Sequence, residues 1–146
     1  MFSRIVVGTD GSDTATAAVT MALELARTSG ATLHVVSAYK DPATTVTVAH
    51  AGAVAVSDAG VSGAVAKSAC EDLLADVMTR AEGLEVQAHA VAGAPADVMV
   101  DVAERVGADL IVVGSKGMKG ARRLIGSVPN SVAHRAPCHV LIAKTT

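Results

Sequence analysis

Aromatic side chains are almost absent from this chain. Its 146 residues include one Tyr, one Phe and no Trp. Proteins that bind single-stranded nucleic acid without sequence preference stack the bases on aromatic rings, so the composition argues against a nucleic-acid partner. Hydrophobic residues make up 51% of the chain. The core must therefore be built from Val, Leu, Ile and Ala.

An excess of charge and a set of paired cysteines are lacking as well. The 12 basic and 14 acidic side chains leave a formal net charge of -2, which provides no general attraction to nucleic acid or to an anionic membrane. Cys70 and Cys138 lie far apart in the sequence, without the cysteine density of a disulfide-stapled secreted domain. We predict that both are reduced structural thiols.

Long apolar segments are also missing. The apolar run after Arg4 ends at Gly8, which is too short for the core of a signal peptide. The Ala/Val-rich region 46–66 is interrupted by His50, Asp58 and several glycines, so it does not resemble a membrane span. We therefore expect no membrane partner and a cytoplasmic location.

The order of sequence patterns predicts one α/β domain over residues 1–146. A chain of this length can bury a real core as a single unit. Strand-like runs alternate with helix-like periodicity, and continuous apolar strands separated by helices indicate a mainly parallel five-stranded sheet covered on both faces. The predicted strands are 3–8, 32–38, 85–91, 109–113 and 139–143. The predicted helices end near Gly30, Gly83, Gly107 and His134, and the second begins near Val65 after a loop or flap that follows Tyr39.

The most informative stretch is rich in glycine. Gly114-Ser-Lys-Gly117 follows the predicted strand 109–113 directly, and Gly126-Ser127 precedes the last predicted helix. Glycine lets the backbone approach an anion closely, and the N–H groups at a helix start point toward negative charge. Four cations lie between the glycines, with no acidic residue among them: Lys116, Lys119, Arg122 and Arg123. The arrangement is typical of a polyphosphate cradle.

A carboxylate follows the first predicted strand. This strand ends in Gly8-Thr-Asp10-Gly-Ser12, and ligands of open parallel sheets bind beyond the carboxyl ends of the strands, where the strand order reverses. If the first and fourth strands are neighbours there, Asp10 and the glycine loop face one pocket. Asp10 could then accept hydrogen bonds from ribose hydroxyls. The local alternative is that Asp10 only caps the first helix or its turn, because Asp-Gly-Ser is a common turn and cap composition.

Several motifs together resemble the universal stress protein family, in its nucleotide-binding branch. The resemblance covers nearly the whole chain apart from the segment after Tyr39. It is carried by Val6-Val-Gly-Thr-Asp-Gly-Ser12, Gly93-Ala-Pro95, Asp109-Leu-Ile-Val-Val-Gly114, Gly126-Ser-Val-Pro129 and Ala136-Pro-Cys-His-Val-Leu-Ile142. The family signature places nine residues between its second and third glycines. Here Gly117 and Gly126 are separated by eight, so the loop is one residue shorter.

The resemblance implies a doubly wound, flavodoxin-like and Rossmann-like fold of the adenine nucleotide alpha hydrolase-like kind, a homodimer formed through the last strand, and a stress-response sensor or regulator that binds ATP. Asp10 would contact the ribose, the backbone of Val35 the adenine, and Gly8 and Thr9 would lie close to the base. The ribose and phosphates would be surrounded by Gly114, Ser115, Gly117, Gly126, Ser127 and Val128.

Other functions stay open at this level. AMP or cyclic AMP could replace ATP, Mg²⁺ could accompany ATP, and the fold could serve as a dimerisation module that binds no nucleotide. No Walker pattern occurs and Asp10 is the one plausible acid, so we expect no catalytic residues and, at most, slow ATP turnover. His134, Cys138 and His139 lack the paired spacing of a zinc site, which predicts no metal centre. We expect His34 and His89 to be hydrogen-bonded strand residues.

Overall fold

The computed structural model describes residues 1–41, 59–115 and 127–145, and gives only the backbone of 59–62. Five strands alternate with four helices in these ranges. The strands are β1 (Arg4–Gly8), β2 (Thr32–Tyr39), β3 (Val86–Ala92), β4 (Leu110–Gly114) and β5 (His139–Ala143). The helices are α1 (Asp13–Ser29), α2 (Ala59–Arg80), α3 (Pro95–Val106) and α4 (Val128–Arg135). The predicted element order is confirmed.

The sheet is parallel throughout and has the order β3-β2-β1-β4-β5. The chain builds outward from β1 through β2 to β3, then crosses to the other side of β1 to add β4 and β5. Strand order therefore reverses between β1 and β4, which lie side by side. The condition under which the sequence placed Asp10 and the end of β4 at one pocket is thus met. A ligand-binding crevice is expected at this point, beyond the carboxyl ends of the two strands.

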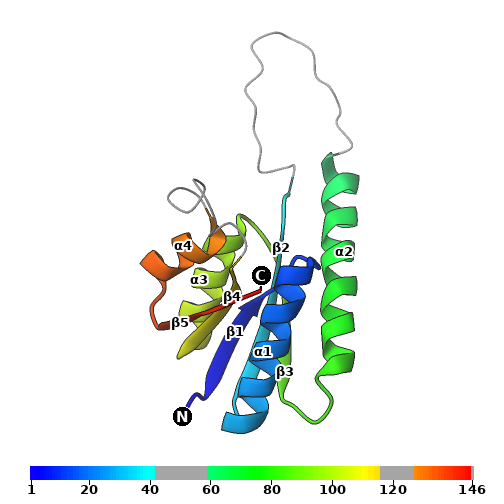
Figure 1. Cartoon of the computed structure of the whole chain (residues 1–146). Helices are drawn as coiled ribbons and strands as arrows, with labels where there is room; N and C mark the ends of the chain where they lie inside the picture. Colours follow the sequence, from blue (N-terminus) through cyan, green and yellow to red (C-terminus); the bar gives the residue numbers. More distant parts are fainter. Residues whose placement is uncertain (42–58, 116–126, 146) are drawn as a thin grey trace, which may run out of the picture.

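Helices cover both faces of the sheet (Figure 1). Helices α1 and α2 pack on one face, and α3 and α4 pack on the other. Side chains alternate between the two faces along each strand, so Ile5 and Val7 belong to the core cluster beneath α1 and α2, whereas Val6 belongs to the cluster beneath α3 and α4. Each central strand therefore contributes side chains to both core clusters. This explains why the strands are apolar runs without alternation.

Local signals set most helix ends. The hydroxyl of Ser12 accepts a hydrogen bond from Ala15 N–H at 3.3 Å and caps α1, and Gly30 ends the helix with φ of 70°. This left-handed conformation carries no steric penalty in glycine. Pro95 lies in the first turn of α3, where its missing N–H removes no helical hydrogen bond. These three ends were readable from the sequence.

Helix α2 begins earlier than the sequence pattern indicated. It begins at Ala59 rather than near Val65, so the predicted start of this helix is corrected. In its second turn, Ala64 and Val65 are exposed rather than packed against the sheet. Periodicity reports packing, whereas alanine favours a helix without it. The first part of the predicted flap, residues 42–58, lies outside the described residues.

Candidate functional site

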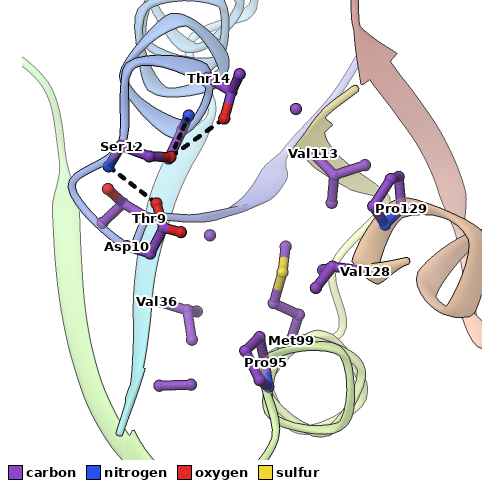
Figure 2. Close-up of a pocket in the computed structure, with 14 residues that line it drawn as sticks. Thr9, Asp10, Ser12, Thr14, Val36, Pro95, Met99, Val113, Val128 and Pro129 are labelled. Atoms are coloured by element: carbon purple, nitrogen blue, oxygen red, sulfur yellow. Dashed lines mark hydrogen bonds between the residues drawn. The ribbon is translucent and has the colours of Figure 1, made fainter. Parts of the chain in front are cut away.

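A cavity lies where the strand order reverses. Its empty volume is about 730 Å³, a figure that includes open solvent at its mouth. It is bounded by the ends of β1, β2 and β4 and by α1, α3 and α4 (Figure 2). The lining residues are Gly8, Thr9, Asp10, Ser12, Thr14, Ala15, Val36, Ala38, Pro95, Met99, Val113, Gly114, Val128 and Pro129.

The turn between β1 and α1 forms the polar wall of this cavity. The N–H of Thr9 donates to the carbonyl oxygen of Val36 at 2.9 Å, which ties the turn to β2. The side chain of Asp10 accepts from Ser12 N–H at 2.9 Å, and that of Thr9 accepts from Gly11 N–H at 3.2 Å. Asp10 is therefore held in a short hydrogen-bonded turn, as the capping interpretation predicts. It also lines the cavity.

Hydroxyl groups continue the polar wall toward α1. The Oγ of Ser12 lies 3.1 Å from the Oγ1 of Thr14, and both residues line the cavity (Figure 2). Since Ser12 also caps α1, the first turn of that helix faces the cavity. The N–H groups of a helix start favour a negatively charged ligand. This end of the cavity is thus suited to hydroxyl or anionic parts of a ligand.

Gly114 permits a close approach of two elements at the same place. A Cβ atom on Gly114 would lie 2.9 Å from the carbonyl oxygen of Thr14 and 3.3 Å from its carbonyl carbon. Only a residue without a side chain lets the end of β4 lie so close to α1. The glycine is consequently needed for packing, whether or not a phosphate approaches its backbone.

The opposite wall of the cavity is apolar. It is formed by Val36 and Ala38 on β2 and by Pro95 and Met99 on α3, with Val128 and Pro129 of α4 nearby. Figure 2 shows the Met99 side chain extending from α3 into the space between β1 and α4. An apolar wall facing a polar one suits a ligand with a flat hydrophobic part and a polar tail.

The structure brings together half of the residues predicted for the site. Those that line the cavity are Gly8, Thr9, Asp10, Gly114 and Val128. Ser127 instead caps α4, accepting a hydrogen bond from Asn130 N–H at 3.3 Å. Gly117 and Gly126 lie outside the described residues, as do the four predicted cations of the glycine loop.

Two residues predicted for the site, Val35 and Ser115, are not among the residues that line the cavity. The Val35 side chain is fully buried in the core beneath α1 and α2, on the face of the sheet away from the cavity, whereas Val36 lines the cavity. The predicted contact of Val35 is through its backbone and stays a prediction. The Ser115 hydroxyl lies 3.0 Å from the Oγ1 of Thr145 and accepts from Thr145 N–H at 3.1 Å. It joins the end of β4 to the residues after β5.

Sequence reasoning missed most of the apolar wall. Gly93-Ala-Pro95 is one of the motifs that carry the family resemblance, but neither it nor Met99 indicates a cavity in the sequence. Ser12 and Thr14 follow Asp10 directly, so their position beside it was a usable signal. Val36 and Ala38 carried no signal, because every residue from Leu33 to Ser37 is buried and the sequence does not distinguish the two faces.

The groups with shifted pKa values lie outside the cavity lining. Burial, followed by the charge on His89, lowers the pKa of His34, and burial together with Arg105 lowers the pKa of His89. His34 Nδ1 and His89 Nε2 lie 3.1 Å apart, and His34 is 3% exposed. The prediction of hydrogen-bonded strand histidines is confirmed.

Metal and thiol chemistry find little support in the described ranges. Within residues 1–41, 59–115 and 127–145, no three His, Cys, Asp or Glu side chains gather as metal ligands would. Cys70 and Cys138 are free thiols, and burial raises the pKa of Cys138, which disfavours the reactive thiolate. No helix in the described part of the chain is long and apolar enough to cross a membrane.

Comparison with known families agrees with this geometry. The model of the universal stress protein family matches residues 1–144. The chain belongs to the universal stress protein family. A universal stress protein of Mycobacterium tuberculosis is 36% identical over 149 residues, covering 99% of this chain and 98% of the relative. Universal stress protein YxiE of Bacillus subtilis is 31% identical and covers 99% and 100%.

Solved structures of this family share the fold. The crystal structure of a universal stress protein in complex with cAMP superposes with a TM-score of 0.76 at 36% identity, covering 99% of both chains. The structure of the universal stress protein from Archaeoglobus fulgidus in complex with dAMP gives a TM-score of 0.62 at 28% identity, covering 96% of both chains. Both relatives were therefore captured with an adenine nucleotide.

Proposed function

We propose that this universal stress protein binds an adenine nucleotide in the cavity between the ends of β1 and β4. The observation that carries the proposal is the meeting of Asp10, the first turn of α1 and Gly114 at the point where strand order reverses. Such crevices hold the ligands of doubly wound sheets. The relatives solved with cAMP and dAMP support an adenine base.

The polarity of the walls orients the nucleotide. The base rests on the apolar wall formed by β2 and α3, where Val36, Pro95 and Met99 lie. The sugar faces Asp10, whose carboxylate accepts hydrogen bonds from hydroxyl groups. The phosphates extend past Ser12 and Thr14 toward Gly114 and the predicted glycine loop. The remaining predicted contacts, through Val35, Ser115, Gly117, Gly126 and Ser127, belong to this proposal as well.

ATP is the first candidate ligand, because four cationic residues lie between Gly114 and Gly126 in the sequence and would balance the negative charge of a triphosphate. Cyclic AMP is the second, since the relative solved with cAMP is 36% identical to this chain. Asp10 is the single carboxylate among the described lining residues. Mg²⁺ bound with ATP would therefore be held chiefly by the phosphates, and turnover of ATP would be slow.

Mass spectrometry of the nucleotide released from the purified protein identifies the ligand. Calorimetric titration then compares ATP, AMP and cAMP, with and without MgCl₂, on wild type and on Asp10→Asn. The asparagine keeps an oxygen that accepts from Ser12 N–H, so the turn persists while the charge is lost. Asp13→Asn is the matched control, because Asp13 lies in the first turn of α1 but does not line the cavity.

We expect Asp10→Asn to weaken binding by about tenfold or more, in line with the loss of a charged hydrogen bond. Asp13→Asn should bind as wild type does. If wild type binds none of the three nucleotides, or if both variants bind as wild type does, the cavity is not a nucleotide site. The alternative of a dimerisation module without nucleotide would then be favoured.

We further propose a homodimer formed through β5, serving as the regulatory unit of a stress response. Within the described residues β5 pairs with β4 alone and leaves Val140, Leu141 and Ile142 partly exposed. An unpaired apolar edge is a liability that pairing with a second copy removes. Sedimentation analysis of Val140→Lys, with Val65→Lys on α2 as control, tests this. A dimer that persists in Val140→Lys would overturn it.

A further inference from the structure

Met99 occupies an unusual position for a core methionine. It lies in the second turn of α3, is 4% exposed, and packs in the cluster beneath α3 and α4 with Val6 and Val102. At the same time it lines the cavity. Figure 2 shows its side chain ending between the Thr9–Asp10 turn and Val128.

Gly8 leaves the space that the Met99 side chain fills. A Cβ atom on Gly8 would lie 2.6 Å from the Sδ of Met99 and 3.0 Å from its Cε. A side chain at position 8 would therefore have to displace the thioether. Gly8 and Met99 form one surface, because the lack of a side chain at Gly8 leaves room for the long side chain of Met99.

This surface belongs to the apolar wall rather than the polar one. Pro95 precedes Met99 by one helical turn, and both line the cavity with Val36 and Ala38. The polar atoms of Asp10, Ser12 and Thr14 belong to the β1–α1 turn and the first turn of α1. A flat aromatic base would bury its area on the apolar wall, and sulfur makes favourable contacts with aromatic rings.

We propose that Met99 determines which adenine bases the cavity accepts, with its thioether acting as the wall against which the base packs. The inference rests on the proposed nucleotide function. An unbranched thioether adapts its shape more readily than a branched side chain. It can therefore fit closely against the unmodified base, whereas its length, with Gly8 directly behind it, fills the space that a bulky substituent on the base would need.

Alanine at position 99 should enlarge this part of the cavity. The experiment measures dissociation constants of ATP, N6-benzyl-ATP and 8-bromo-ATP for wild type, Met99→Ala and Met99→Leu. The two analogues carry bulk on different edges of the base, so the edge that faces Met99 is identified. The control is Val102→Ala, which truncates a fully buried residue of the same helix and cluster that does not line the cavity.

In Met99→Ala, we expect the affinity for at least one bulky analogue, relative to ATP, to rise about tenfold or more, the scale on which small changes of an apolar pocket act. Val102→Ala and the volume-conserving Met99→Leu should keep the wild-type ratios. Circular dichroism establishes that each variant is folded. Should Met99→Ala not fold, Met99→Val replaces it, and the same shift in ratio is expected to a smaller degree.

The outcomes separate this inference from the proposed function. If ATP binding depends on Asp10 but no analogue ratio changes in the position 99 variants, Met99 is only a core residue and the inference is overturned while the nucleotide site stands. A ratio that changes equally in Val102→Ala also overturns it, because general loosening of the core would then be the cause. If wild type binds no nucleotide, the proposed function itself fails.

Discussion

Replacing Gly114 by alanine tests the close contact between β4 and α1. The added Cβ would lie 2.9 Å from the Thr14 carbonyl oxygen, whereas ordinary contacts begin at 3.4 Å. The difference, 3.4 minus 2.9, requires a movement of 0.5 Å. The neighbour is backbone in the first turn of α1, so the turn itself must move rather than a side chain.

The expected cost follows from two opposing effects. Overpacking of a well-packed site costs about 1–3 kcal/mol, while the lower entropy of the unfolded chain returns about 0.4–1 kcal/mol. The free energy of unfolding should therefore fall by roughly 0.5–2 kcal/mol. In a domain of this size each kcal/mol lowers the melting temperature by about 2–4 °C. Urea unfolding followed by far-UV circular dichroism measures the loss.

Gly8→Ala is the matched control for this prediction. Its Cβ would also meet a neighbour, the Sδ of Met99 at 2.6 Å, but that neighbour is the end of a flexible side chain that can turn away. We expect Gly8→Ala to lose less stability than Gly114→Ala. A Gly114→Ala variant as stable as wild type, with an unchanged denaturant slope, would show that β4 and α1 are not in rigid contact.

Three further predictions concern protonation, capping and the core. The pKa values of His34 and His89 are lowered in the folded protein, so the unfolded chain binds more protons below about pH 6.5. The contribution of the pair to stability should therefore be complete above that pH and be lost as the pH decreases through it. His89→Gln should flatten the dependence of the urea midpoint on pH. Ser12→Ala removes the cap of α1 and should cost about 1 kcal/mol, whereas Ser12→Asn should cost less; equal losses in urea unfolding would refute a capping role. Ile111 is fully buried in β4, so Ile111→Val should lower the unfolding free energy by about 0.5–1.5 kcal/mol, and an unchanged value would mean that the site relaxes without a cavity.

The histidine pair shows how burial controls this pH response. His34 Nε2 is buried and has no hydrogen-bond partner within the described residues. The positive charges of Arg4 and Arg105 also oppose protonation, because Arg4 lowers the pKa of His34 and Arg105 lowers the pKa of His89. The charge on Glu85 raises the pKa of His34, but it is the weakest of the influences on that pKa. The neutral pair is therefore the stable form in the folded protein.

The sequence alone determined the elements and their order. Glycine at the ends of α1 and α3, Pro95 in the first turn of α3 and Ser12 before α1 act through the local backbone. Continuous apolar strands between helices required a parallel sheet with both faces covered. Asp10 and Gly114 could be placed at one crevice only on the condition that their strands are neighbours, and the pairing of β1 with β4 supplied that condition.

The tertiary structure decided which side chains form the cavity. Val35 and Val36 are both apolar, and only the pairing of β2 with β1 and the packing of α3 turn Val36 toward the cavity and Val35 away from it. Met99 reads as a core residue in sequence, and its contact with Gly8 depends on α3 crossing the end of β1. Strand and helix patterns describe neighbours along the chain, whereas a binding site is made by neighbours in space.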